Sequence, residues 1–327
     1  MTESAGAGSE DRALVLLPLS ILLENIGSLY VPVLACAEIF VPDAEDLGLS
    51  GSSQIDAEAF ATTLHSIRPT AMILPPQLLE LVVALAQQKL LPDSFRYVAV
   101  GGAPVSIELL DAARALELPV YQGYGLSEAC SVVALNTAEN NRMGSVGRPL
   151  AHNSVRINEK DEVVVMGETF NGYLNEPERD PKDELATGDL GCLDEDGYLY
   201  ITGRCRDRII TGFGRNVSPE WVESELQSHP LIAQAAVVGN NMPCLVAVLA
   251  LHESQDFSKD AIDRAVQEVN ERLPDYARIR EYVIAQSPFS VVSGELAVSG
   301  SPCRAVIETH YYEQIKNQLE VQNEQLL

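Results

Sequence analysis

The stretch that decides the fold runs from residue 187 to residue 223 and reads TGDLGCLDEDGYLYITGRCRDRIITGFGRNVSPEWVE. It places a carboxylate directly after a flexible glycine, Gly188-Asp189, and continues with a hairpin signal at 196–198 and a short β-type run at Tyr198–Thr202. Four arginines follow closely, at 204, 206, 208 and 215. A carboxylate can accept two hydrogen bonds from a vicinal diol such as a ribose, and arginines suit phosphate groups. An ordinary turn does not explain why these features occur together. The combination indicates a nucleotide-binding region.

Four motifs precede this stretch. They are Gly101-Gly102-Ala103-Pro104, Tyr121-Gln-Gly-Tyr124-Gly-Leu-Ser127-Glu128, Gly144-Ser-Val-Gly-Arg-Pro149, and Gly167-Glu168 with Gly172-Tyr-Leu-Asn175. Each motif alone is a weak signal, but five motifs in this order argue against a chance match. Over roughly residues 14 to 304 the chain resembles the AMP-forming acyl-CoA synthetase and adenylating-enzyme superfamily, and most of all its long-chain acyl-CoA synthetases.

The resemblance implies a place for the adenine of ATP or AMP. Gly101, Gly102 and Ala103 are expected to lie against the base, and Tyr124, followed by Gly125, to pack on its face. The physical logic agrees, because a glycine turn permits close approach of the backbone and an aromatic ring offers a stacking surface.

The resemblance also implies catalytic and ribose-binding residues. Ser127 is expected to reach the phosphate and Glu128 to hold Mg²⁺, a hard cation that prefers carboxylate oxygens. Asp189 and Arg204 are expected to hold the ribose. A solvated basic loop is the alternative explanation of the arginines.

The family resemblance further implies a hinge near Cys205, with Arg206 where relatives usually carry Asp or Lys. A small carboxyl-terminal domain is then expected to swing between an orientation for adenylation and one for transfer to CoA. Gly212 and Gly214 are expected beside the pantetheine channel, where missing side chains let a slender thiol arm pass. A tight loop is the alternative explanation of the two glycines.

Periodicity predicts an α/β fold in the first part of the chain. Helices are expected at 55–67, 76–88 and 107–116 and buried strands at 71–74 and 97–100. Short strands at 154–157, 162–166 and 198–202 predict a small β-barrel-like subdomain at about 144–204. Residues 1–204 are therefore interpreted as a truncated large adenylate-binding domain.

Residues 205–327 predict a mobile α+β carboxyl-terminal domain. Helices are expected at 219–228, with Ser218 as the cap, and at 259–273, and paired strands at 235–239 and 245–251.

Composition and charge limit the partners. The formal net charge of −25 over 327 residues argues against nucleic acid, whose phosphates the chain would repel. The six cysteines form no CxxC pair, which is typical of reduced thiols in a cytoplasmic protein. The apolar segment at residues 13–37 contains Pro18, Glu24, Asn25 and Pro32, so it predicts a buried strand, a turn and a helix and no membrane span. It resembles the family segment that borders the acyl pocket, but Ile21 stands where relatives commonly have His, and core packing is expected there.

Two family features are not found in the sequence. One is the Ser/Thr/Gly-rich loop ending in Pro-Lys-Gly that wraps the ATP phosphates. The other is a lysine near the end of the family pattern, where Ser293–Arg304 has Ser or Gly, so that Arg304 could substitute only if the loop shifts. The chain is accordingly interpreted as lacking a first subdomain, and the surface this would expose predicts self-association or a partner.

Three functions remain open. The first is an AMP-forming ligase that adenylates an apolar or fatty carboxylate and transfers the acyl group to CoA, weak or inactive in this form. The second is a non-catalytic protein that binds a nucleotide or acyl adenylate, or one half of a split enzyme. The third is an adenylation domain that loads a carrier protein, for which no carrier-like segment follows.

Overall fold

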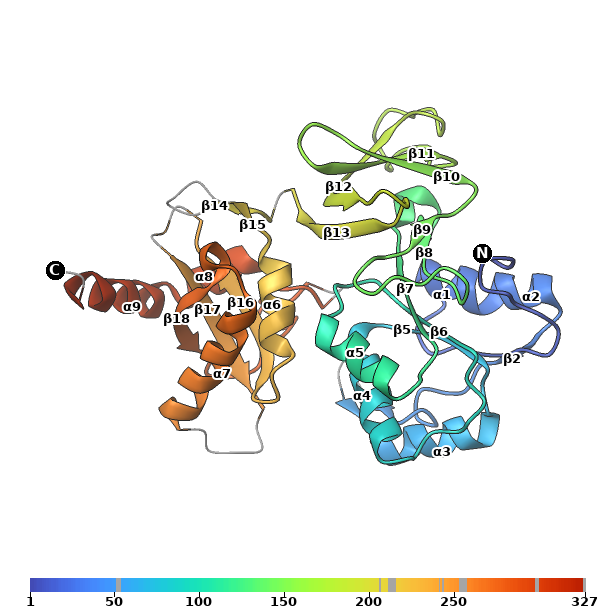
Figure 1. Ribbon diagram of the computed structural model, residues 1–327, viewed down its shortest axis with the longest axis horizontal. Helices are drawn as coiled ribbons and strands as arrows, with labels where there is room; N and C mark the ends of the chain where they lie inside the picture. Colours follow the sequence, from blue (N-terminus) through green and yellow to red (C-terminus); the bar gives the residue numbers. More distant parts are fainter. Residues whose placement is uncertain are drawn as a thin grey trace. The chain divides into compact units, whose positions relative to one another are not determined.

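The chain folds into two compact units, Met1–Thr202 and Gly203–Leu327 (Figure 1). The computed structural model describes residues 1–50, 54–205, 207–210, 216–240, 242, 244–252, 258–297 and 300–325. Each unit has its own hydrophobic core, and each is described by itself.

The first unit is built on a seven-stranded sheet with the strand order β2-β1-β5-β6-β7-β8-β9. Neighbouring strands run parallel from β2 to β7, and β8 and β9 are added antiparallel. The strands are β1 Arg12–Leu14, β2 Glu38–Phe40, β5 Ala71–Leu74, β6 Tyr97–Val100, β7 Val120–Tyr124, β8 Ala134–Leu135 and β9 Arg148–Pro149. A separate short pair is formed by β3 Leu49–Ser50 and β4 Gln54–Ile55.

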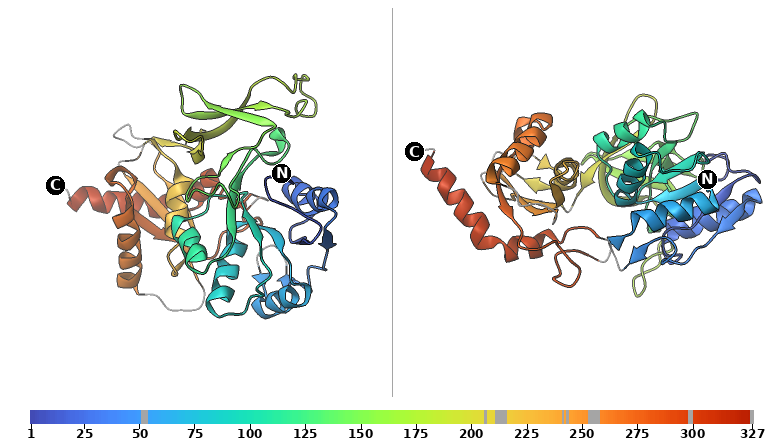
Figure 2. Two further views of the ribbon diagram at one scale, coloured as in Figure 1. Left: turned by 45° about the vertical axis from the view of Figure 1, so that its right-hand side comes forward. Right: turned by 90° about the horizontal axis from the view of Figure 1, so that it is seen from below.

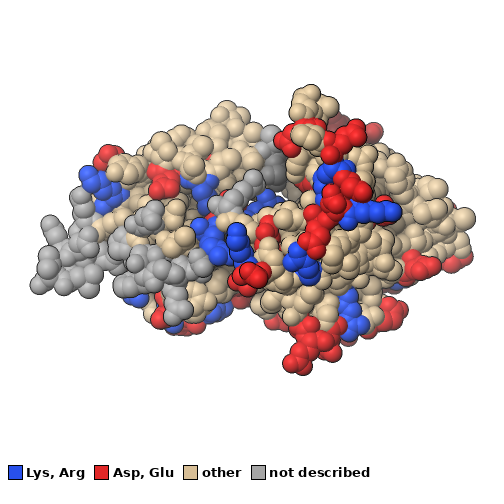
Figure 3. All heavy atoms as spheres, turned by 90° about the horizontal axis from the view of Figure 1, so that it is seen from above, with Lys and Arg blue, Asp and Glu red and all other residues tan. Residues whose placement is uncertain are grey.

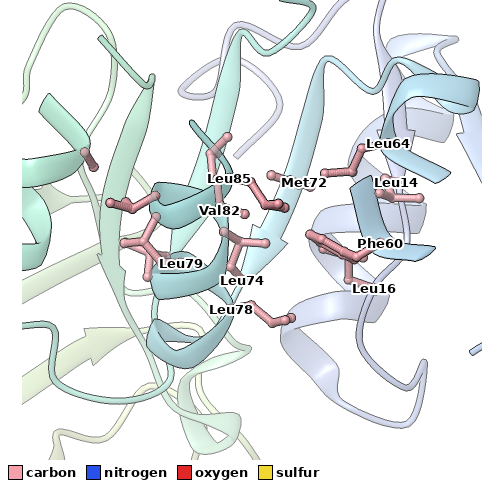
Figure 4. Close-up of a cluster of buried hydrophobic side chains, with 14 of the residues drawn as sticks. Leu14, Leu16, Phe60, Leu64, Met72, Leu74, Leu78, Leu79, Val82 and Leu85 are labelled. Carbon is pink, nitrogen blue, oxygen red and sulfur yellow. The ribbon is translucent and has the colours of Figure 1, made fainter. Parts of the chain in front are cut away.

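Three helices pack on one face of this sheet: α3 Ala57–Ile67, α4 Pro76–Gln87 and α5 Ile107–Ala115 (Figures 1 and 2). Their starts follow from local sequence, because Asp56 and Ser106 accept backbone hydrogen bonds as N-caps and Pro76 occupies the first turn of α4. The buried leucines of α3 and α4 interdigitate with Leu14, Met72 and Leu74 of the strands (Figure 4). These predicted helices and the strands at 71–74 and 97–100 are confirmed.

The segment after β1 covers the other face of the sheet. It comprises the short helices α1 Leu22–Asn25, η1 Ile26–Tyr30, a π-helical turn, and α2 Val31–Ala35. The predicted order of strand, turn and helix is confirmed here. The prediction of core packing for Ile21 is wrong, because the residue is 41% exposed. It lies at the N-cap of α1, before the helical face that buries Glu24. Val33 and Leu34 of α2 are also exposed.

A second sheet has the strand order β10-β11-β12-β13, in which β10, β11 and β12 pair antiparallel. Its strands are β10 Asn153–Ile157, β11 Glu162–Gly167, β12 Leu185–Leu193 and β13 Leu199–Arg204. This is the expected β-rich part, and in the described residues it is an open sheet with β10 and β13 at its edges. The sequence did not reveal β12, whose register is interrupted by an irregularity opposite Glu162 and Val164 and whose Gly188 has a left-handed φ of 75°.

The second unit has a three-stranded sheet with helices on both faces. The strands are β16 Ile232–Val238, β17 Leu245–Leu251 and β18 Ile279–Ile284, and a short hairpin is formed by β14 Ile209–Ile210 and β15 Asn216–Val217. The helices are α6 Pro219–Gln227, α7 Lys259–Arg272, η3 Asp275–Ala277, α8 Arg304–His310 and α9 Tyr312–Gln325. Alternate residues of β17 face opposite sides: Ala247 joins the core under α6 and α7, and Val248 joins the core under α8.

The predicted elements of this unit are present, with one local correction. Ser218 occupies the N-cap position of α6, but its side chain makes no capping bond. Its hydroxyl donates to Glu220 instead, at 3.0 Å. A carboxylate two residues into the helix competes with the backbone for this hydroxyl.

Candidate functional site

A cavity of about 230 Å³ lies in the first unit, on the face of the seven-stranded sheet opposite α3, α4 and α5. Its walls come from the start of the chain, from α1 and η1, and from the ends of β5, β6 and β7. Most of the lining side chains are apolar, including Leu23 and Val31 from the segment expected to border an acyl pocket. The cavity extends along the strands from Ala71 and Tyr97, at the starts of β5 and β6, to Gly101 and Gly102 after the end of β6. Its second end thus lies at the carboxyl ends of parallel strands, where ligands are commonly bound.

Two of the predicted motifs form one part of the cavity wall. Gly101 and Gly102 follow β6 and line the cavity, whereas Ala103 is exposed and is not among the lining residues. A Cβ on Gly101 would lie 3.0 Å from the carbonyl oxygen of Gly123, and Gly102 has a φ of 84°. The turn therefore requires glycine for close approach at one position and for backbone conformation at the other.

The second motif is a closed loop between Tyr124 and Val133. The amide of Val133 donates to the carbonyl of Tyr124 at 2.8 Å, and the amide of Ser131 donates to Leu126 at 3.1 Å. A Cβ on Gly125 would lie 1.5 Å from the carbonyl oxygen of Ser131, so the chain crosses itself where only glycine fits. The loop thereby brings Tyr124, Gly125 and Ser127 together at the cavity.

The hydroxyl of Tyr124 donates to Oδ2 of Asp189 at 2.6 Å. This bond connects β7 to β12 across 65 residues of sequence and places the predicted ribose carboxylate beside the predicted adenine loop. Asp189 is buried, with 7% of its surface exposed. The sequence motif predicts a use only for the ring face of Tyr124, and no local pattern signals the hydrogen bond of its hydroxyl to Asp189.

Glu128 lies on the short helix η2 Ser127–Ala129 and is half-buried. Its Oε1 accepts a hydrogen bond from the hydroxyl of Tyr173 at 2.8 Å, and this bond raises the pKa of Tyr173. Tyr173 belongs to the motif at 172–175, but its position in the sequence does not signal the bond to Glu128. Ser127 is exposed beside it.

The described residues contain no group of three or more metal-binding side chains. Glu128 nevertheless fits Mg²⁺, because this ion is usually held by one or two carboxylates together with the phosphates of the substrate.

The second unit carries the predicted arginine cluster. Arg204 ends β13 and is exposed. The predicted hinge residue Arg206, the glycines Gly212 and Gly214, and Arg215 lie outside the described residues. Their roles, and that of Arg204 at the ribose, stay predictions.

Arg304, considered above as a substitute for the expected lysine, is committed to carboxylates within the second unit. Its guanidinium donates to both oxygens of Glu223, from Nε at 2.9 Å and from Nη2 at 2.6 Å. Nη1 lies 3.6 Å from Glu220 and 3.7 Å from Asp207. This arrangement is a partly buried ion cluster, in which the charge of Arg304 is paired with carboxylates of its own unit.

Surface charge and helix hydrophobicity relate to the predictions about nucleic-acid and membrane partners. On the face drawn in Figure 3, acidic and basic side chains are interspersed over the described atoms. None of the helices in the part of the chain that the structure describes is long and apolar enough to cross a membrane.

Comparison with known proteins agrees with this geometry. Residues 1–174 match the family model of the AMP-binding enzymes, and residues 206–322 match the model of the AMP-binding enzyme carboxyl-terminal domain. The long-chain-fatty-acid–CoA ligase FadD15 of Mycobacterium bovis is 34% identical over 248 residues, which are 68% of this chain and 41% of the relative. The 2-succinylbenzoate–CoA ligase of Bacillus velezensis is 37% identical over 179 residues, which are 49% of this chain and 36% of the relative.

A solved structure extends the likeness to the whole fold. The o-succinylbenzoate CoA synthetase MenE of Bacillus subtilis, in complex with the acyl-adenylate intermediate OSB-AMP, has a TM-score of 0.75 and 25% identity. The match covers 93% of this chain and 62% of that protein, and the chain spans about two fifths of the length of the curated relatives. The family model covers more than half of the sequence, and the chain therefore belongs to the AMP-binding enzyme family.

Proposed function

We propose that this chain carries the adenylate site of an AMP-forming carboxylic acid:CoA ligase. In that reaction a carboxylate oxygen attacks the α-phosphorus of ATP and pyrophosphate leaves. The thiol of CoA then attacks the acyl carbonyl and AMP leaves. The observation that carries the proposal is the convergence of the Gly101–Gly102 turn and the Tyr124–Ser127 loop on one apolar cavity.

The geometry supports a role for each polar group in this site. Tyr124 presents its ring to adenine while its hydroxyl orients Asp189. An ionised carboxylate offers about four acceptor positions, so Asp189 can accept from Tyr124 and still accept from a ribose. Ser127 is exposed beside the cavity and contacts phosphate, and Glu128 holds Mg²⁺ jointly with that phosphate.

The cavity holds the acyl group in this proposal. Its apolar lining excludes water from the bond being formed, and the adenine motifs at its edge place the carboxylate beside the nucleotide. Among the relatives, one is named for long-chain fatty acids and two for succinylbenzoate, so the likeness supports both alkyl and aryl acids.

A second candidate is an acyl-adenylate-binding protein without adenylation activity. The observation that favours it is the pairing of Arg304 with Glu223, Glu220 and Asp207, in a stretch that has Ser or Gly where lysine is expected. Loss of one preorganised charge from a catalytic site costs about 2 to 4 kcal/mol, or about two to three decades of rate.

Titration calorimetry with AMP, ATP and a non-hydrolysable acyl sulfamoyl adenosine, each with Mg²⁺, tests the proposed site. We expect the acyl compound to bind more tightly than AMP. Asp189→Asn removes the charge that holds the ribose, so AMP should bind about ten- to hundredfold more weakly. The control Asp43→Asn changes an exposed aspartate elsewhere in the first unit and should leave the affinity unchanged.

Two outcomes separate the candidates. Formation of acyl-CoA from acid, ATP and CoA supports the ligase. Tight binding of the acyl compound, with no AMP released from acid, ATP and CoA, supports the binding protein. If the native chain binds neither AMP nor the acyl compound, both candidates are wrong.

A further inference from the structure

Ser131 is a buried polar residue in the wall of the cavity. Only 6% of its surface is exposed. Its hydroxyl oxygen is buried and has no hydrogen-bond partner among the described residues. Buried hydroxyls in native proteins are almost always hydrogen-bonded, so this one requires an explanation.

The other buried polar side chains of the cavity have partners within the protein. Tyr97 donates its hydroxyl to the carbonyl of Asn136 at 3.0 Å, and Asp11 is paired with Arg96 at 2.7 Å. Among the described lining residues, Ser131 is the one whose buried polar side-chain atom is left without a partner.

The backbone at Ser131 is also strained. Its φ is 84°, a left-handed conformation that L-residues rarely adopt, and Cys130 before it has a φ of 55°. Glycine would relieve the strain, yet the position carries a hydroxyl that has no hydrogen-bond partner in the part of the chain that the structure describes. Strain of this kind persists where the surrounding structure enforces it and clusters at ligand-binding sites. Here the chain crosses itself at Gly125, where the Ser131 carbonyl packs against the glycine, and this close approach holds the backbone at Ser131.

The volume of the cavity limits the size of the acyl group that it can hold. An apolar cavity of about 150 Å³ holds one benzene molecule. The present cavity of about 230 Å³ is about half as large again, so it accommodates a substituted ring or a short chain. A long unbranched acyl chain is larger than this volume, so part of it would have to remain outside the cavity.

We propose that Ser131 hydrogen-bonds a polar substituent on the acyl part of the ligand. The acid is then an aromatic or short-chain carboxylic acid that bears a hydroxyl, carbonyl or amino group, and it is not a long-chain fatty acid. This inference rests on the proposed function, because it assigns the acyl group of the adenylate to this cavity.

The test compares acyl sulfamoyl adenosines that share the nucleotide and differ only in the acyl part: benzoyl, 2-hydroxybenzoyl, 3-hydroxybenzoyl and dodecanoyl. Calorimetry measures their affinities for the native chain, Ser131→Ala and Ser131→Gly. The glycine variant also removes the hydroxyl and suits the left-handed backbone, so it guards against misfolding of the alanine variant. Ser66→Ala, an exposed serine on α3, is the matched control.

We expect one hydroxybenzoyl compound to bind the native chain about three- to tenfold more tightly than the benzoyl compound. Both Ser131 variants should lose this preference and keep the native affinity for AMP, whereas Ser66→Ala should retain the preference. The dodecanoyl compound should bind more weakly than the benzoyl compound.

Three results would overturn the inference while leaving the adenylate site intact. They are equal affinities for benzoyl and hydroxybenzoyl compounds, a preference that survives in both Ser131 variants, and dodecanoyl binding as tight as benzoyl binding. If neither AMP nor any acyl compound binds, the proposed function itself is wrong.

Discussion

Two buried glutamates, one in each unit, are neutralised in different ways. Glu24 in α1 of the first unit is fully buried, and its Oε1 accepts from the amide of Leu16 at 2.8 Å. Its Oε2 has no hydrogen-bond partner among the described residues, and burial raises its pKa to about 7. Glu223 in α6 of the second unit is 3% exposed, and both of its oxygens accept hydrogen bonds, from Arg304 and from the amide of Val237.

The two glutamates differ in whether the protein itself satisfies the buried carboxylate. Glu223 is neutralised by a cation in fixed bidentate geometry, and Arg304 is consequently unsuitable as a catalytic charge. Burial raises the pKa of Glu24 to about 7, so a proton neutralises this side chain below that pH. Its Oε2 and the hydroxyl of Ser131 in the same unit have no hydrogen-bond partner among the described residues. Glu223 thus has both oxygens hydrogen-bonded within its own unit, whereas Glu24 and Ser131 of the first unit each keep one oxygen without a hydrogen-bond partner among the described residues.

Breaking the saturated pair should have the largest effect. Arg304→Met leaves Glu223 as an unpaired buried charge, so we expect the second unit to lose about 3 to 5 kcal/mol of unfolding free energy. Trp221 is the only tryptophan of the chain and lies on α6, the helix that also carries Glu223. Urea unfolding followed by its fluorescence therefore reports on this unit.

The double variant Arg304→Met with Glu223→Gln should recover part of this loss, because the charge disappears together with its partner. Arg156→Met is the control. It breaks an exposed pair with Glu184 in the first unit and should change the stability by less than about 1 kcal/mol. Equal effects of Arg304→Met and Arg156→Met would contradict the distinction between saturated and exposed pairs.

Glu24→Gln should change how the stability of the chain depends on pH. The folded-state pKa of Glu24 is raised from 4.5 to about 7, so the folded chain binds more protons than the unfolded chain between these values. The stability contributed by protonated Glu24 is present below about pH 4.5 and is lost as the pH rises through about 7. Gln does not titrate. Relative to the native chain, the variant should therefore gain about 1 to 3 kcal/mol between pH 5 and pH 8.

Urea unfolding followed by circular dichroism at the two pH values measures this difference. Other groups titrate equally in both proteins and cancel. Parallel stability curves for the native chain and Glu24→Gln would mean that Glu24 is ionised throughout this range and that its burial is compensated by other contacts.

Local signals explain why much of the fold was predictable. Helix starts at Asp56 and Ser106 carry capping side chains, and the predicted helix ends differ from the observed ones by no more than two residues. Strand β12 was missed because Gly188 and Gly191 interrupt its pattern and its pairing is irregular. Ile21 was misplaced because its exposure depends on packing around α1 and not on its apolar character.

The candidate site was predictable as a set of motifs, and its connections were not. Gly101 and Tyr124 reach the same cavity as the sequence order suggested. The bond from Tyr124 to Asp189 joins residues 65 apart, and the bonds from Arg304 to Glu223 join residues 81 apart. Such pairings follow from tertiary packing, because many polar residues at these separations are chemically equivalent partners. The unsatisfied hydroxyl of Ser131 is likewise visible only in three dimensions.

Tyr124→Phe tests the connection between the adenine loop and the ribose carboxylate. The variant keeps the ring but removes the hydroxyl that orients Asp189. We expect AMP to bind about three- to tenfold more weakly, a smaller loss than that of Asp189→Asn, because the carboxylate itself remains. Calorimetric titration measures it. A loss equal to that of Asp189→Asn would show that Tyr124 contributes more than orientation.

The smallest effect should come from removing an unsatisfied group. Ser131→Ala deletes a buried hydroxyl that has no partner among the described residues, so the unfolding free energy should change by less than about 0.5 kcal/mol or increase slightly. Tyr97→Phe is the matched variant in the same cavity wall, because its hydroxyl donates to the carbonyl of Asn136, and it should lose about 1 kcal/mol or more. Urea unfolding followed by circular dichroism compares the two. If Ser131→Ala costs as much as Tyr97→Phe, the hydroxyl of Ser131 is satisfied within the protein and has no need of a ligand.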